Sequence, residues 1–303
     1  MYLKKPYSNE RNGVQDYHKG VRMRIFTIIA FLILSSTITF SQPHDVYEVY
    51  AIEYAKDSAW VPVSEIALEA NSKDSVTFSY YVWFLKGDNG RKILVDAGFG
   101  FLEDTIKHRG YYRKYQRPDL ALQRINVHAD EITDVIITHP HVDHIGGLQL
   151  FTKATIWMQK NDFAYFVGGA WQKGASHLGL DKQDVSKIIQ ANLDGRLQLV
   201  DGDSIEIIPG IRVFIGSKHS YESQHLLVSS KTEKVLLASD DCWFYYNLDY
   251  LLPVPMTFDA HAYVAQLRRM KTLVADTQLI VPGHDPLVLS RFHQVAKGVV
   301  RIR

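Results

Sequence analysis

The sequence predicts an α/β protein in which helices cover β-sheets, and three observations support this. Of the 303 residues, 46% are hydrophobic and 22% are charged, a balance typical of a folded protein with a sizeable core. From about residue 45 onward, short runs of β-branched and aromatic residues alternate with helical patterns. The predicted strands outnumber the helices but are interleaved with them, which favours sheets covered by helices.

The strands are predicted from short apolar runs, most of which end in a Gly, Asp or Pro turn. They are expected at residues 46–54, 77–86, 91–96, 131–138, 155–159, 205–208, 211–215, 225–229, 234–238 and 278–281. Helices are expected where apolar residues recur at intervals of three and four. These segments are the region after residue 101, then 148–151, 161–166, 181–192 and 260–275. Because no linker or repeat interrupts this order, residues 42–303 are expected to form one domain.

Residues 23–41 have the pattern of a bacterial signal peptide. An apolar run follows the basic residues Lys19, Arg22 and Arg24, and it is shorter than the roughly 20 residues needed to cross a bilayer. Cleavage is expected before Gln42, which places the domain in the periplasm or outside the cell; an uncleaved membrane anchor is the alternative. Residues 1–22 are read as a non-structural extension or a mis-assigned start that precedes Met23.

Charge and cysteine content limit the function classes. The formal net charge is +1 and no block of Lys and Arg stands out, so nucleic acid is not expected as a partner and a small-molecule substrate is. The single cysteine, Cys242, excludes an internal disulfide and any Cys-rich zinc module. A metal site in this chain has to be built from histidines and carboxylates. The sequence does not indicate the oligomeric state.

A cluster of ligand-type side chains follows one buried strand. The run Thr-His-Pro-His-Val-Asp-His-Ile-Gly-Gly at residues 138–147 places His139, His141, Asp143 and His144 within six residues. In an extended loop, residues two apart point to the same side, so His139 and His141 can converge on one metal ion. Asp143 and His144 stand on the turn that opens a helix, where they can reach a neighbouring point. This spacing predicts a metal site.

Three further candidate ligands each follow a predicted strand. His219 follows the strand at 211–215, Asp240 the strand at 234–238, and His284 the strand at 278–281. Loops at strand ends are places where a rigid scaffold carries functional side chains. Together with the first cluster, these residues predict a site with seven protein ligands.

The His-x-His-x-Asp-His motif and the three later ligands resemble the metallo-β-lactamase superfamily over residues 77–284. The resemblance implies an αββα sandwich with His139, His141 and His219 on one metal ion, Asp143, His144 and His284 on a second, and Asp240 between them. Asp241 is the less favoured bridge, because relatives usually have Gly-Asp and Ser239 occupies the Gly position. The strand and turn at 93–98 also resemble the family, which implies that Asp96 supports the metal loop. The remaining histidines are expected to be structural or exposed; they are residues 18, 44, 108, 128, 177, 225, 261 and 293.

Two adjacent divalent cations would make a water molecule nucleophilic near neutral pH and polarise a carbonyl or phosphoryl oxygen. Asp143 and Asp240 are therefore the expected catalytic carboxylates, Asp143 by orienting the nucleophile and passing a proton to the leaving oxygen. Mixed imidazole and carboxylate ligands favour Zn²⁺ and are compatible with iron or manganese.

Within the superfamily, the segments 80–84, 170–171, 237–240 and 281–286 are most similar to the N-acyl homoserine lactone lactonase-related branch. That resemblance implies hydrolysis of a lactone or small ester. In those lactonases a Tyr three residues after the bridging Asp holds the substrate carbonyl, whereas this chain has Trp243, which can donate a hydrogen bond but no proton. Tyr245 or Tyr246 could substitute for it. Aromatic residues at 161–179, Trp171 among them, and at 99–115 are either pocket lining or core.

Other activities on the same fold remain open. Export favours a β-lactamase, but Asp240 argues against it because true β-lactamases usually lack the bridging Asp. Phosphodiester hydrolases share the motif, and an iron-dependent sulfur dioxygenase uses the same scaffold. A hydrolysis screen together with metal analysis separates these alternatives.

Overall fold

The structure is a computed structural model that describes residues 45–100 and 112–303. The predicted export segment and the helix expected after residue 101 lie outside the described residues. The described residues belong to one compact unit. No helix of the described part is long and apolar enough to cross a membrane.

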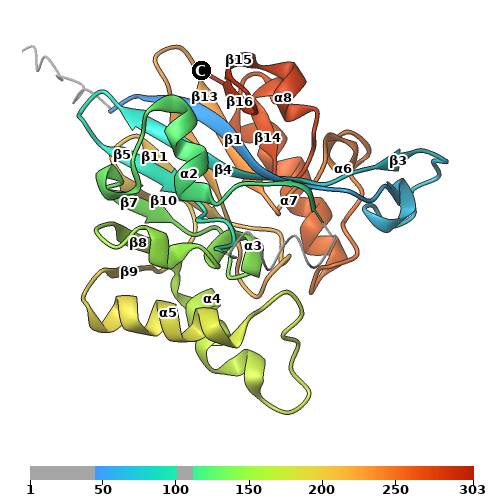
Figure 1. Ribbon diagram of the computed structural model, residues 1–303. Coiled ribbons are helices and arrows are strands. Elements are labelled where there is room, and N and C mark those ends of the chain that lie inside the picture. Colours follow the sequence, from blue (N-terminus) through green and yellow to red (C-terminus); the bar gives the residue numbers. More distant parts are fainter. Residues whose placement is uncertain (1–44, 101–111) are drawn as a thin grey trace, which may run out of the picture. The chain divides into compact units, whose positions relative to one another are not determined.

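The larger of two main sheets has the strand order β15-β16-β1-β4-β5-β7-β8-β9 (Figure 1). With β6, which pairs with β1, it contains nine of the described strands. Its strands are β1 (Tyr47–Asp57), β4 (Ser79–Gly87), β5 (Lys92–Val95), β6 (Tyr112–Tyr115), β7 (Asp134–Ile136), β8 (Thr155–Gln159), β9 (Leu197–Val200), β15 (His293–Ala296) and β16 (Val299–Arg301). The pairs β5–β7, β7–β8 and β8–β9 are parallel, and the other pairs of this sheet are antiparallel.

The second main sheet has the order β10-β11-β12-β13-β14 in the described chain, with only the β13–β14 pair parallel. Its strands are β10 (Ile205–Ile208), β11 (Ile211–Ile215), β12 (Gln224–Ser229), β13 (Lys234–Ser239) and β14 (Ile280–Pro282). A small separate pair joins β2 (Val61–Pro62) to β3 (Ser75–Val76).

Successive side chains along the strands point to opposite faces of the sheets, and the buried ones form three clusters of apolar core. In β4, Tyr81 and Trp83 belong to a core cluster shared by the two main sheets, whereas Val82 and Phe84 belong to a cluster with residues of the surrounding helices. Such period-two alternation with both faces buried is expected for a sheet that packs on both sides. The outer face of the second sheet makes a third cluster with Leu267 and other helical residues.

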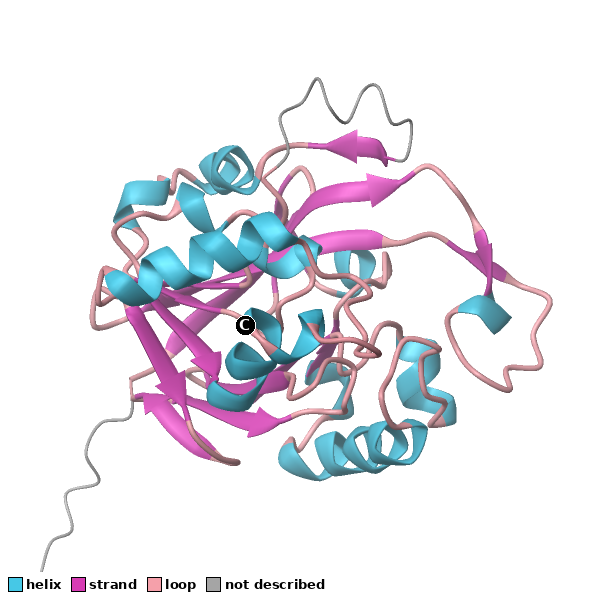
Figure 2. Ribbon diagram, turned by 90° about the horizontal axis from the view of Figure 1, so that it is seen from below, coloured by secondary structure: helices cyan, strands magenta, loops and turns pink. Residues whose placement is uncertain are grey.

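Figure 2 distinguishes the helices from the strands by colour. The helices are α2 (Pro118–Leu122), α3 (Val142–Ile145), α4 (Lys160–Val167), α5 (Lys182–Leu193), α6 (Tyr245–Tyr250), α7 (Ala260–Leu273) and α8 (Val288–Arg291). Helices α4 and α5 pack on the larger sheet and α7 packs on the second, so the predicted αββα sandwich is confirmed. Asp181 and Asp259 cap α5 and α7 by accepting backbone N–H bonds.

The predicted strands of the two main sheets are confirmed, with shifts of a few residues at their ends. The strands predicted at 131–138 and 278–281 are shorter, because 3-10 turns at Ala129–Glu131 and Thr277–Leu279 replace their starts. Residues 148–151 form a 3-10 turn at Leu148–Leu150 rather than an α-helix. The strands β2, β3, β6, β9, β15 and β16 and the helices α6 and α8 were not predicted.

Candidate metal centre

The loop after β7 carries four of the predicted ligands. His139 and His141 stand between β7 and α3, and Asp143 and His144 lie on α3. The turn is held by the Tyr54 hydroxyl, which donates to the Asp143 carbonyl at 2.8 Å. Two glycines leave room for this turn. A Cβ on Gly147 would collide with the Ala97 carbonyl, and a Cβ on Gly179, which has a φ of +77°, would collide with the His141 ring.

The other three predicted ligands reach the same place from three loops of the second sheet. His219 lies between β11 and β12, Asp240 follows β13, and His284 follows β14. Because β13 and β14 are parallel neighbours, their carboxyl ends meet at one edge and bring Asp240 beside His284. All seven side chains are thereby gathered at one edge of the sandwich, and their donor atoms form two groups.

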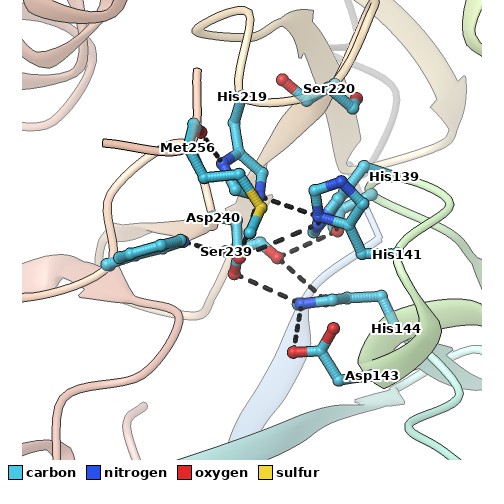
Figure 3. A network of polar contacts seen from close by, with 12 residues as sticks. His139, His141, Asp143, His144, His219, Ser220, Ser239, Asp240 and Met256 are labelled. Atoms are coloured by element: carbon cyan, nitrogen blue, oxygen red, sulfur yellow. Dashed lines mark hydrogen bonds and ion pairs between the residues drawn. The ribbon is translucent and has the colours of Figure 1, made fainter. Parts of the chain in front are cut away.

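The first group consists of His139, His141, His219 and Asp240. His141 Nδ1 lies 3.0 Å from His139 Nε2 and 3.0 Å from His219 Nε2 (Figure 3). Asp240 Oδ2 lies 3.2 Å from His219 Nε2. Ligand atoms bound tetrahedrally to one Zn²⁺ lie about 3.3 Å from one another, so these spacings suit a single ion.

The second group consists of Asp143, His144 and His284. Asp143 Oδ2 lies 3.2 Å from His144 Nε2 and 3.6 Å from His284 Nε2. The other oxygen of Asp240, Oδ1, is 3.3 Å from His144 Nε2 and 3.0 Å from His284 Nε2. His284 Nε2 also lies 3.2 Å from Asp240 Oδ2. The Asp240 carboxylate therefore lies between the groups, with Oδ1 on the side of the second group and Oδ2 within reach of both.

Three of the imidazoles have their tautomer set by an acceptor on the far side of the ring. The Nδ1 atoms of His144, His219 and His284 lie 2.8 Å from Asp96 Oδ2, 2.7 Å from the Met256 carbonyl and 3.1 Å from the Ser79 carbonyl. An acceptor at Nδ1 places the proton there, which leaves the Nε2 lone pair directed into the centre.

Burial and the neighbouring charges shift the pKa values in two opposite directions. Burial lowers the pKa of His141 to about 3 and that of His139 well below its ordinary value, so both rings are neutral ligands. Burial also opposes protonation of His144, but Asp143, Asp240 and Asp96 outweigh it and raise the pKa of His144. Burial raises the pKa of Asp143, yet His144 outweighs it and brings the value to about 2.

The donor set fits divalent cations. Imidazole lone pairs and carboxylate oxygens face one another, and His144 Nε2 and Asp240 Oδ1 are buried atoms without a hydrogen-bond partner in the described chain. Acceptors that converge in a buried site repel one another unless positive charge lies between them. These residues therefore fit metal ions.

Asp96 supports the centre from behind, as the family resemblance implied. It is fully buried, its Oδ1 accepts the Thr138 backbone N–H at 2.8 Å, and its Oδ2 faces His144 Nδ1. Asp96, Lys218 and Ser239 have φ values of 60°, 61° and 46°, a left-handed conformation that is unfavourable for non-glycine residues and often occurs at functional sites. Glycine adopts this conformation readily, which is consistent with the Gly-Asp pattern that the family resemblance implied at Ser239-Asp240.

Asp241 points away from the ligands and organises the loop that carries His219. Its Oδ1 accepts from the Ser217 backbone N–H at 2.9 Å and from the hydroxyls of Ser217 and Ser223, and its Oδ2 lies 3.0 Å from His225 Nδ1. His225 is buried and structural, in agreement with the expectation. On the other side of the loop, Asp162 accepts from the Ser220 hydroxyl at 2.7 Å.

A cavity of about 190 Å³ opens beside the first group. The residues that line it are His141, Ser176, Leu178, His219, Pro255, Met256, Thr257 and Phe258. Trp171 and Tyr245, which were expected to bind substrate, are not among them. The Trp171 indole donates to the Phe166 carbonyl at 2.6 Å, and the buried Tyr245 ring packs under the Arg291 guanidinium at 3.6 Å. Trp171 is partly buried against the core, and the buried Tyr245 also lines a separate cavity of about 420 Å³. Substrate contact by either residue stays a prediction.

Sequence reasoning missed several groups that position the ligands. The carbonyls of Ser79 and Met256 orient His284 and His219, and the hydroxyls of Thr138 and Ser239 contact Asp96. A backbone carbonyl leaves no sequence signal. The two hydroxyls did leave a sequence signal, because Thr138 and Ser239 each stand directly before a predicted ligand, His139 and Asp240.

Comparison with known proteins identifies a family and several similar proteins. A family model described as the Metallo-beta-lactamase superfamily matches residues 73–284. An N-acyl homoserine lactonase of a Bacillus species is 26% identical over 248 residues, which cover 75% of this chain and 92% of that protein. The N-acyl homoserine lactonase AiiA of Bacillus thuringiensis subsp. kurstaki is 25% identical with the same coverage.

Solved structures show the same fold. An N-acyl homoserine lactone hydrolase with the product N-hexanoyl-L-homoserine bound at its catalytic metal centre has a TM-score of 0.66 at 20% identity, over 82% of this chain and 98% of that one. The dizinc quorum-quenching lactonase AidC has a TM-score of 0.60 at 16% identity, over 81% of this chain and 92% of that one.

Proposed function

The chain belongs to the metallo-beta-lactamase superfamily and is a metal-dependent hydrolase, and on this basis we propose that it uses two metal ions to hydrolyse an ester or lactone of the N-acyl homoserine lactone type. The observation that carries the proposal is the pair of ligand groups with the Asp240 carboxylate between them. The similarity to N-acyl homoserine lactonases over three quarters of the chain supports the substrate class.

His139, His141 and His219 would hold one ion, Asp143, His144 and His284 the other, and Asp240 would contact both. Zn²⁺ is the proposed metal, since imidazole and carboxylate ligands in groups of three and four suit it. Two such ions supply Lewis acidity and lower the pKa of a bound water.

Asp143 is placed to handle the proton in this reaction. Its side chain is 19% exposed, more than His144 or Asp240, so it faces the open side of the centre. With a pKa of about 2 it is ionised at neutral pH and accepts hydrogen bonds only. In the proposed mechanism its carboxylate accepts a hydrogen bond from the attacking water, takes up the proton that this water releases, and then passes that proton to the leaving oxygen.

The cavity beside His141 and His219 favours an apolar acyl or lactone group over a phosphodiester. The described residues that line it include no Lys, Arg, Asp or Glu, and Leu178, Met256 and Phe258 form its apolar surface. Recognition of a phosphate group typically uses Arg or Lys. A neutral carbonyl compound matches this lining better.

We also propose that the protein is exported, through the segment 23–41. The support is the sequence pattern of basic residues, a short apolar run and small residues before Gln42. Fusing this segment to a reporter enzyme tests the proposal. Reporter activity outside the cytoplasm is expected, whereas reporter activity confined to the cytoplasm would contradict export.

The proposed activity is tested by a hydrolysis screen of the purified, metal-analysed protein. Acyl homoserine lactones of increasing chain length, simple esters, a β-lactam, a thioester and a phosphodiester are compared at equal concentration. Turnover of lactones or esters well above the other classes is expected. Turnover confined to the β-lactam or phosphodiester, or oxygen consumption with a persulfide by an iron-loaded protein, would overturn the substrate class.

A further inference from the structure

Trp243 occupies the place where the two ligand groups meet. It stands in the turn between β13 and α6, and its carbonyl accepts the backbone N–H of His284 at 2.9 Å. Its indole ring contacts the imidazoles of His219, with centroids 5.5 Å apart, and His284, with centroids 6.1 Å apart. Phe78 packs edge-on against it at 5.5 Å. Because His219 belongs to the first group and His284 to the second, one side chain touches both.

The indole N–H is already committed to a protein acceptor. Nε1 donates to Asp240 Oδ2 at 2.7 Å, and the side chain is buried. An N–H bonded in this way is not free to hold a substrate carbonyl, which was the role expected from its position. This hydrogen bond points to a role for Trp243 toward Asp240 rather than toward the substrate.

Trp243 is also the unambiguous donor to the Asp240 carboxylate within the described chain. The nearby imidazoles of His144, His219 and His284 do not donate to this carboxylate, because their protonated Nδ1 atoms face other acceptors. Asp240 Oδ1 has no hydrogen-bond partner among the described residues. The Tyr263 hydroxyl donates to the Asp240 backbone carbonyl at 2.9 Å, which fixes the main chain but not the carboxylate plane.

We propose that Trp243 is a positioning residue that fixes the Asp240 carboxylate so that one oxygen faces each metal ion. A carboxylate oxygen has two lone pairs, so Oδ2 can accept the indole N–H and still bind an ion. The hydrogen bond also stabilises the buried negative charge. This inference rests on the proposed two-metal centre and goes beyond it, since it assigns a function to a side chain that is not a ligand.

Trp243→Phe tests the inference because it removes the donor and keeps an aromatic ring. The chain offers a matched control: the Trp157 indole donates to the buried carboxylate of Asp134 at 3.0 Å, in β8 and outside the seven-ligand cluster. Zn²⁺ affinity is measured for purified wild type, Trp243→Phe and Trp157→Phe by competition with a chelator. Loss of a group that orients a metal ligand typically weakens affinity about 10–100-fold.

The expected result is that Trp243→Phe binds at least one ion about 10–100-fold more weakly, while Trp157→Phe binds both like wild type. Wild-type affinity for both ions in Trp243→Phe would overturn the inference and leave the two-metal proposal standing. A wild-type protein that binds no metal would instead overturn the proposed function.

A second measurement on the wild type does not depend on the variant folding. With ¹⁵N-labelled indoles and Co²⁺ in the centre, one of the five tryptophan N–H resonances should be strongly shifted by the paramagnetic ions. Five indole resonances at the same positions as in the Zn²⁺-loaded protein would overturn the inference.

Discussion

At the scale of single residues, the centre depends on which ring nitrogen of each histidine holds the proton. His144, His219 and His284 each have an acceptor at Nδ1, and two of these acceptors are backbone carbonyls that substitution cannot remove. The third is the Asp96 carboxylate, which is therefore the position where a mutation can test this arrangement.

Asp96→Asn should weaken metal binding about 10–100-fold. Asparagine has one acceptor oxygen, whereas Asp96 uses one oxygen for the Thr138 backbone N–H and the other for His144 Nδ1. One of these donors would face an amide N–H₂ instead. Chelator competition measures the loss, with the helix cap Asp181→Asn as the control that should not change affinity. Unchanged affinity in Asp96→Asn would show that Asp96 does not position His144.

At the scale of structural elements, the loop between β11 and β12 is clamped by a carboxylate on each side. Asp241 binds the Ser217 and Ser223 hydroxyls, and Asp162, from α4, binds the Ser220 hydroxyl and the Glu222 backbone N–H. His219 is therefore held by contacts on both sides of it in the chain.

Gly216→Ala should displace this loop. A Cβ at Gly216 would collide with the Asp241 carboxylate, which cannot move without losing the serine hydrogen bonds. Overpacking of this kind costs about 1–3 kcal/mol, and the first metal should bind more weakly because His219 shifts. Chemical denaturation and metal titration measure both effects. Gly168→Ala, where the nearest heavy atom is 3.5 Å from the new Cβ, is the control, and equal behaviour of the two variants would refute the clamp.

Asp162 should make stability depend on pH. Burial raises its pKa to about 7, against the partial opposition of its hydrogen bonds to Ser220 and Glu222. Between about pH 4 and pH 7 the native state thus retains a proton that the unfolded chain has released, so the free energy of unfolding falls as the pH rises through this window and is level above it.

Asp162→Asn removes this titration, so its stability relative to wild type should increase from pH 4 to pH 7 and then stay constant. For a shift of this size the change is at most about 4 kcal/mol. Denaturation of both metal-free proteins at several pH values measures the difference between their free energies of unfolding. The contributions of the other titrating groups are the same in both proteins and cancel in this difference. A difference that is independent of pH would mean that Asp162 is ionised in the folded protein throughout.

The strands with long apolar runs were the elements that could be predicted from the sequence. The long apolar strands were predictable because burial on both faces leaves continuous hydrophobic runs, and the ligands were predictable because they follow those runs. The edge strand β15 and its neighbour β16 are short, and three of the four β15 residues are exposed, so these strands lack a long apolar run. The packing of Trp171 and Tyr245 could not be predicted, because an aromatic residue near a site has the same pattern whether it lines a pocket or fills the core.

At the scale of the whole molecule, the two sheets bring together ligands that are separated by as many as 145 residues, from His139 to His284. The larger sheet supplies the His-x-His-x-Asp-His loop, and the second sheet supplies His219, Asp240 and His284. Each ion would therefore have ligands from both sheets, which predicts that metal binding stabilises the packing of one sheet on the other.

The measurement that tests the central claim most directly is the metal content of purified wild type, His139→Ala and His284→Ala, determined by elemental analysis after removal of loosely bound ions. We expect two ions per chain in wild type and a loss of about one ion in each variant, since each variant lacks a ligand of a different group. One ion or none in wild type, or a variant that retains both ions at full occupancy, would contradict the two-metal centre.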